Sequence, residues 1–264
     1  MLQALLYLAV SFLASVVGAI CGIGGGVIIK PMLDLCALGS VSTISFLSGC
    51  TVLSMSCYSV GRNLLSGGNK VDLKTGTPLA IGAAAGGVAG KQLFSAVSAM
   101  SANPNMAGAV QSLCLALITA GTFVYTVFKS RIRTHKVDSG AACVAIGLAL
   151  GVMSSFLGIG GGPINLVVLF FFFGMDTKTA AQNSLYMILF SQIASLLTTL
   201  VTGSVPDFAW SALALMICGG IGGGAAGRAV NKRMDNAAVD KLFMGLMAVI
   251  IFVSVYNAVR YSAL

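Results

Sequence analysis

The segment CGIGGGVIIKP, Cys21 to Pro31, interrupts an apolar stretch with a cluster of glycines and then places a lysine inside it. The core of this segment, GIGGG, returns in LGIGGGPINLV, so Gly22–Gly26 and Gly158–Gly162 are identical. Glycine costs about 1 kcal/mol relative to alanine inside a helix, and several in succession predict that the helix unwinds. Two identical breaks in one chain therefore predict two related halves, each with an interrupted helix.

The chain is too poor in charge to cover a water-soluble surface. Of its 264 residues, 57% are hydrophobic and 8% are charged, and the mean hydropathy is +0.97. Soluble domains carry about 25% charged residues, whereas a membrane helix needs about 20 apolar residues to cross the bilayer. We therefore predict an all-α integral membrane protein, a multi-pass bundle in the lipid bilayer of the cell (inner) membrane.

Apolar runs separated by short polar turns define the predicted segments. Each half is expected to contain a glycine-broken hairpin followed by three full spans. The predicted segments of the first half are 2–20, 27–38, 41–61, 73–98 and 106–128. Those of the second half are 141–157, 163–174, 179–202, 208–227 and 239–259.

Three landmarks set the register of the repeat. The two breaks are 136 residues apart, Asp72 and Asp207 are 135 apart, and Lys91 and Arg228 are 137 apart. The predicted organisation is a first transmembrane repeat, 1–128, a basic cytoplasmic linker, 129–140, and a second transmembrane repeat, 141–264.

The distribution of basic residues predicts the orientation. The net charge is +8, from 15 Lys and Arg against 7 acidic residues. If 129–136 is cytoplasmic by the positive-inside rule, then 12 of the 15 basic residues fall on that side, and Lys30, Lys91 and Arg260 do not. Because three spans is an odd number, the halves run in opposite directions, which is the inverted repeat of many secondary transporters. A parallel repeat is the alternative. Because membrane topology accounts for the excess of basic residues, no nucleic-acid partner is expected.

The breaks are candidate ligand sites. Proline is favoured at the first position of a helix, so Pro163 predicts that a half-helix starts directly after the second break. The free N–H groups at such a start bind anions. The glycines that would let an anion approach are Gly24, Gly25, Gly26, Gly160, Gly161 and Gly162. The alternative is helix packing by small residues, which we expect for the other glycine-rich runs, GAAAGGVAG and GGIGGGAAG.

A lysine at membrane depth is a functional candidate by default, so Lys30 is a candidate ligand of the anion. The alternative is an ion pair with Asp34, four residues further along. Asn165 lies one place before the position equivalent to Lys30. The second half would then supply an amide where the first supplies a charge.

The spans after the hairpins begin with polar side chains, which could hydrogen-bond a substrate or a neighbouring helix. These side chains are Ser45, Ser48 and Cys50 in the first half and Gln182, Asn183 and Ser184 in the second. The seven cysteines include no CxxC pair, and we expect most of them to be packing residues. No metal site is expected.

The GIGGG pair, the NSL at Asn183 and the G-x-x-x-D turns in GNKVD and GSVPD resemble the sulfite exporter TauE/SafE family of membrane permeases. The resemblance covers essentially the whole chain. It implies export or uptake of sulfite, sulfoacetate or another small organosulfonate by bacteria, with Gly22–Gly26, Gly158–Gly162 and Asn183–Ser184 at the substrate site. The first half departs from the family pattern, because FLSGC, residues 46–50, stands where a Thr-Ser pair is expected.

We therefore predict a secondary transporter, a permease, of a small sulfur-containing anion such as sulfite or an organosulfonate, held between the two breaks. A transporter or channel for another small anion, such as a carboxylate, thiosulfate or sulfate, is the alternative. An enzyme is not expected, because HExxH is absent and the single histidine, His135, lies in a loop. A scaffold whose glycines only pack helices would move no solute. We expect no cofactor, expect a proton or sodium ion as the coupling ion, and make no prediction of oligomeric state.

Overall fold

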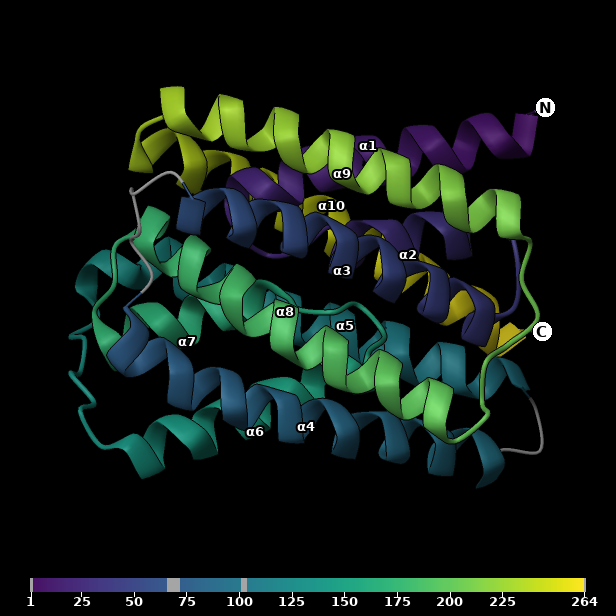
Figure 1. Cartoon of the computed structure of the whole chain (residues 1–264), viewed down its shortest axis with the longest axis horizontal. Coiled ribbons are helices and arrows are strands. Elements are labelled where there is room, and N and C mark those ends of the chain that lie inside the picture. Colours follow the sequence, from purple (N-terminus) through teal and green to yellow (C-terminus); the bar gives the residue numbers. More distant parts are fainter. Residues whose placement is uncertain (1, 66–71, 101–103, 264) are drawn as a thin grey trace.

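The computed structural model describes residues 2–65, 72–100 and 104–263, and these fold into a bundle of α-helices (Figure 1). The helices of the first half are α1 (Leu2–Cys21), α2 (Gly26–Leu35), α3 (Val41–Leu65), α4 (Leu73–Met100) and α5 (Pro104–Phe128). A short 3-10 turn, η1 (Lys129–Arg131), starts the linker. The helices of the second half are α6 (Gly140–Phe156), α7 (Pro163–Phe173), α8 (Thr177–Val201), α9 (Trp210–Arg233) and α10 (Asn236–Ala263). The prediction of an all-α fold is confirmed for the described residues.

Each predicted segment corresponds to one helix, and the largest difference lies at the end of α9. We predict this end at residue 227, whereas the helix continues to Arg233. Lys232 and Arg233 occupy the last turn, where basic side chains are stabilised by the negative end of the helix dipole. The polar residues at the end of α9 therefore extend the helix instead of ending it.

Six of the described helices are long and apolar enough to cross a bilayer, namely α1, α3, α5, α8, α9 and α10. The predicted span 73–98 corresponds to α4, which is 28 residues long but lies outside this set. The chain is a multi-pass membrane protein.

The two hairpins open toward opposite ends of the bundle. Figure 1 shows both termini at one end, the terminal end, and residues 129–139 at the other, the linker end. The Tyr7 hydroxyl donates a hydrogen bond to the Leu38 carbonyl at 2.7 Å, so α2 returns toward the end where α1 begins. The His135 N–H donates to the Phe171 carbonyl at 2.7 Å, so α7 returns to the linker end.

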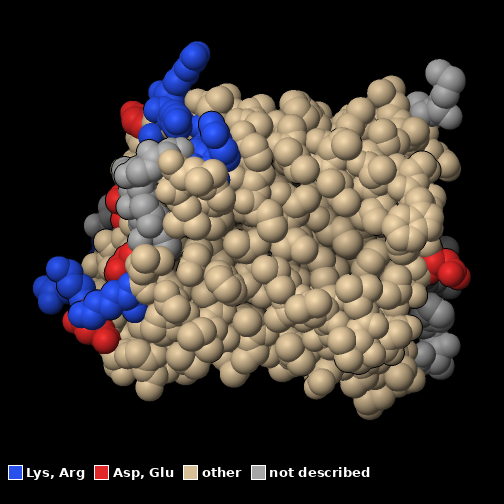
Figure 2. Space-filling model, viewed as in Figure 1, with Lys and Arg blue, Asp and Glu red and all other residues tan. Residues whose placement is uncertain are grey.

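The two ends of the bundle also differ in charge. In Figure 2 the Lys and Arg side chains gather at the linker end, and the broad flank between the ends is uncharged in that view. By the positive-inside rule we predict that the linker end faces the cytoplasm. An inverted relation between the halves accounts for both the charge and the hairpins, and it stays a prediction.

The helices pack in reciprocal pairs. The most extensive contacts join α4 to α6 and α1 to α9, and exchanging the halves converts one pair into the other. The same exchange leaves the pairs α5 with α10 and α3 with α8 unchanged, because each pair joins equivalent helices of the two halves. Two related halves arranged around a common axis produce this pattern.

Glycine stripes make the two main pairs possible. The stripes are Gly82, Gly86 and Gly90 on α4, which face α6, and Gly219, Gly223 and Gly227 on α9, which face α1. A Cβ atom at any of these positions would overlap an oxygen atom of the facing helix. The packing interpretation of the two long glycine-rich runs is thus confirmed, because small residues let membrane helices approach closely.

We expect Gly86→Ala and Gly223→Ala each to destabilise the protein by about 1–3 kcal/mol, the usual cost of overpacking a tight interface. Gly245→Ala on α10 is the matched control, because no atom lies within 4 Å of a Cβ at that position. It should be neutral or stabilising, since alanine favours helix. Unfolding of the purified variants in detergent measures the effect, and equal stability of all three would contradict the role of the stripes.

Single cysteines at Ser139 and Ser204, in a cysteine-free background, should be labelled from opposite sides of the membrane, with position 139 cytoplasmic. Both residues are exposed, so an impermeant thiol reagent can reach each from its own side. The measurement is labelling of intact cells and of inverted vesicles. Labelling of both positions from one side would exclude the inverted repeat.

Candidate functional site

The two breaks begin with the same backbone conformation. The φ angles of Gly22 and Gly158 are 76° and 65°, and those of Gly24 and Gly160 are 71° and 72°. Glycine enters this left-handed region without the steric cost that a side chain brings. The chain therefore leaves the helix in the same way at equivalent positions of both halves.

The half-helices after the breaks begin differently. α7 starts at Pro163 with Gly162 as its N-cap, as predicted. α2 starts at Gly26, and its N-cap, Gly25, already has helical angles of φ −67° and ψ −20°. No side chain caps either start, so the first N–H groups of both half-helices depend on backbone, water or a ligand for partners.

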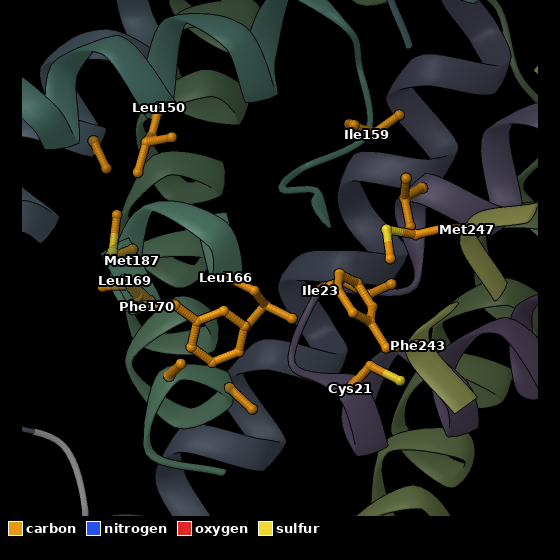
Figure 3. Close-up of a cluster of buried hydrophobic side chains, with 14 of the residues drawn as sticks. Cys21, Ile23, Leu150, Ile159, Leu166, Leu169, Phe170, Met187, Phe243 and Met247 are labelled. Carbon is orange, nitrogen blue, oxygen red and sulfur yellow. The ribbon is translucent and has the colours of Figure 1, made fainter. Parts of the chain in front are cut away.

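The breaks lie against each other. A Cβ on Gly26 would overlap the carbonyl oxygen of Ile159, and a Cβ on Gly161 would lie 3.3 Å from the carbonyl oxygen of Ile23. Figure 3 shows Ile23 and Ile159 in the same cluster of buried hydrophobic side chains. Close packing is therefore one reason for glycine at both positions. The free space of the site lies beside the breaks.

A narrow cavity adjoins the second break, with about 20 Å³ of space, which is room for about one water molecule. Its lining includes Ser45, Lys91, Gln111, Ser155, Gly158 and Gln192, and we call it the Lys91 cavity. The Ser45 and Ser155 hydroxyls and Oε1 of Gln111 are buried without a hydrogen bond among the described residues. Buried polar atoms normally have partners, so these groups are available to a bound molecule.

Lys91 supplies the positive charge of this cavity. It is half-buried on α4, and its Nζ lies 5.4 Å from the centre of the Phe94 ring. Within the described ranges no carboxylate forms a salt bridge with it. A cation beside hydroxyl and amide groups forms charge-assisted hydrogen bonds with an anion, so the chemistry of the lining suits a small anionic ligand.

Lys30 is buried and paired. Its Nζ lies 2.9 Å from Oδ2 of Asp34, and both residues are at most 4% exposed. The predicted alternative, a structural ion pair, is therefore confirmed as a contact. The Lys30 stem nevertheless passes close to the cavity, because a Cβ on Gly158 would lie 3.5 Å from Lys30 Cε.

The C-terminal part of α10 holds this ion pair in place. The Tyr261 hydroxyl donates to Oδ1 of Asp34 at 3.1 Å. The Arg260 guanidinium donates to the carbonyls of Asp34 and Leu35 at 3.2 and 2.9 Å, which satisfies the open carbonyls at the end of α2. Asp34 is thus held by Lys30 on its own helix, α2, and by residues of α10. These contacts fix the end of α2 to α10.

The other predicted residues lie in several places. Ser48 and Ser184, at equivalent positions, are fully buried, and their hydroxyls have no partner within the described chain. Asn165 lies between α4, α6, α7 and α8, where it lines a crevice too narrow to hold a water molecule. Cys50 lines an apolar groove between α3 and α8, and the Asn183 amide donates to the Thr179 carbonyl at 2.9 Å.

Sequence reasoning missed Lys91, Gln111 and Gln192 as lining residues of the site. Lys91 carried a signal, because it is one of few basic residues outside the cytoplasmic set and is the repeat partner of Arg228. The two glutamines are isolated polar residues in apolar helices. Polar residues within membrane segments usually face the protein interior, and this rule could have identified them.

Comparison with known proteins agrees with this architecture. The family described as "Sulfite exporter TauE/SafE" matches residues 7–254. The chain belongs to the sulfite exporter TauE/SafE family. It is also similar to the "Probable membrane transporter protein YunE" of Bacillus subtilis (strain 168), with 26% identity over 246 residues, covering 86% of this chain and 88% of that protein. No solved structure matches. The chain is therefore a TauE/SafE membrane transporter.

We expect Lys30→Met to lower stability by about 3–5 kcal/mol, because it leaves the Asp34 carboxylate buried without its cation. The double variant Lys30→Met with Asp34→Asn should recover most of this loss, since no charge is then left unpaired. Unfolding of the purified variants measures both effects.

Failure of the double variant to recover stability would contradict the structural ion pair. Anion flux through the same double variant tests the second role of Lys30. Wild-type flux would exclude Lys30 as a ligand of the transported anion.

Proposed function

We propose that this TauE/SafE protein is a secondary transporter of a small sulfur-containing anion, such as sulfite or an organosulfonate. The observation that carries the proposal is the Lys91 cavity. It joins a half-buried cation to buried hydroxyl and amide groups beside a glycine break. Family membership supports the same class of substrate, since the matching family is described as a sulfite exporter.

The chemistry of the cavity fits an anion with several oxygen atoms. Each sulfite oxygen accepts hydrogen bonds, and the Ser45 and Ser155 hydroxyls can donate them. Lys91 adds charge in a site with little water, where electrostatic attraction is stronger than in bulk solvent. A carboxylate, thiosulfate or sulfate would use the same groups, and these anions are the competing substrates.

A transporter is favoured over a channel by the closed centre of the molecule. The contact of Gly26 with the Ile159 backbone leaves no room for an added methyl group, and a methyl group on Gly161 would have to displace the end of the Ile188 side chain. A channel needs a continuous wetted path, whereas a transporter closes its centre in each state and opens alternately. We propose a proton or sodium gradient as the driving force.

The test is flux into liposomes that contain the purified protein. We expect saturable uptake of radiolabelled sulfite or sulfoacetate that exceeds that of sulfate, thiosulfate and acetate and responds to an imposed proton or sodium gradient. Gly161→Leu should abolish this flux, because a leucine would displace Ile188 and force the breaks apart. Gly245→Leu, at an open position, is the matched control and should transport normally.

Two outcomes would contradict the proposed function. The first is equal, non-saturable movement of all five anions, which would indicate a channel. The second is wild-type flux of sulfite in Gly161→Leu, which would show that the breaks take no part in transport.

A further inference from the structure

A second cavity lies at the linker end of the bundle. It has about 320 Å³ of space and, unlike the Lys91 cavity, collects several basic side chains. Its lining includes Ala19, Ser59, Lys178, Ala181, Arg228, Asn231 and Lys232, and we call it the Arg228 cavity.

The repeat register places both cavities at the same position in the two halves. Arg228 corresponds to Lys91, and six lining positions of the Arg228 cavity correspond to lining positions of the Lys91 cavity at the offset of 136. The six correspondences are Ala19 with Ser155, Ser59 with Ser195, Asn63 with Thr199, Ala181 with Ser45, Gln182 with Phe46, and Leu185 with Gly49. Each half thus contributes one basic residue at an equivalent point of an equivalent cavity.

Each cavity also adjoins the end of a broken helix. The Gln111 amide donates to the carbonyl of Phe156 at 2.5 Å, and the Asn231 amide donates to the carbonyl of Ile20 at 2.6 Å. Ile20 and Phe156 are equivalent positions, directly before the breaks. The two amides come from non-equivalent helices, α5 and α9, yet each lines its own cavity. Both cavities therefore meet the breaks, one from each end.

The cavities differ in the groups that they offer an anion. The Ser45 and Ser155 hydroxyls of the Lys91 cavity are replaced by the methyl groups of Ala181 and Ala19 in the Arg228 cavity. The Arg228 cavity instead adds Lys178 and Lys232 to its arginine and is wider. Hydroxyl groups select by hydrogen bonding, whereas clustered charges in a wide mouth attract hydrated anions from a distance.

We propose that the two cavities are two binding places on one anion path, with separate tasks. The Arg228 cavity collects the hydrated anion at the linker end through its charge. The Lys91 cavity binds the same anion at the terminal end through hydrogen bonds to Ser45 and Ser155, and there it distinguishes sulfite-like anions from others. This proposal rests on the proposed function and adds to it the residues that act on each side.

The test measures the sulfite KM from each side of the membrane in liposomes with uniformly oriented protein, at low and high potassium chloride. Arg228→Gln should raise the KM from the linker end by roughly 10- to 100-fold, the loss expected for hydrogen bonds to a charged group. It should also reduce the salt dependence of that KM, because salt screens attraction between charges in open solvent. The KM from the terminal end should change little.

Lys91→Gln should show the reverse pattern. The KM from the terminal end rises, the KM from the linker end and its salt dependence stay near wild type, and the preference for sulfite over chloride falls. Lys91→Arg and Arg228→Lys should keep most of the affinity on their own sides. Ser45→Ala removes one hydroxyl with minimal disturbance and should raise the KM at the terminal end by roughly 3- to 10-fold.

Matched variants separate this inference from the proposed function. Ala181→Ser, the counterpart of Ser45→Ala, should leave the KM at the terminal end unchanged. If wild-type protein carries sulfite but Arg228→Gln, Lys91→Gln and Ser45→Ala alter both sides equally, the inference fails and the proposed function stands. Absence of sulfite flux in the wild-type protein would overturn both.

Discussion

The contact between the two unwound segments is the constraint on which the rest of the structure depends. Non-helical backbone at membrane depth is tolerated only where protein or a water-filled cavity satisfies its polar groups. Here Gly26 lies on Ile159, Gly161 lies close to Ile23, and amides from α5 and α9 close the helices before the breaks. Separating the breaks would expose these groups to lipid. The breaks therefore stay covered only because the halves are interlocked.

The charges at membrane depth follow from the same constraint. A single buried charge is costly, and a pair is tolerated only with good geometry and further hydrogen bonds. Lys30 and Asp34 meet this requirement with the help of Tyr261 and Arg260 on α10. Because the pair is neutral as a unit, its field falls off quickly with distance. Lys91, which has no carboxylate partner in the described chain, then dominates the potential in its cavity.

Much of the fold could be predicted from the sequence, because hydropathy and glycine act locally. The segments, the start of α7 at Pro163 and the packing role of the long glycine runs all follow from neighbouring residues. The residues that line the site could not be predicted as well, because they depend on which face of each helix points into the cavity. Ser45 and Cys50 lie on the same helix, yet Ser45 lines the Lys91 cavity and Cys50 an apolar groove. Gln111 lines the site from α5. Its polarity indicates that it faces the protein interior, but the sequence of α5 does not show which helix it contacts.

The unequal size of the cavities bears on how the protein works. The Arg228 cavity is much larger than the Lys91 cavity, about 320 Å³ against about 20 Å³, although equivalent parts of the two halves build both. When two halves with the same fold take different local shapes, exchanging those shapes gives a second state of similar energy. In that second state the Lys91 cavity would be wide and the Arg228 cavity narrow. If the halves form the inverted repeat that the sequence predicts, the described conformation is the state open toward the linker end, and its counterpart follows from the repeat.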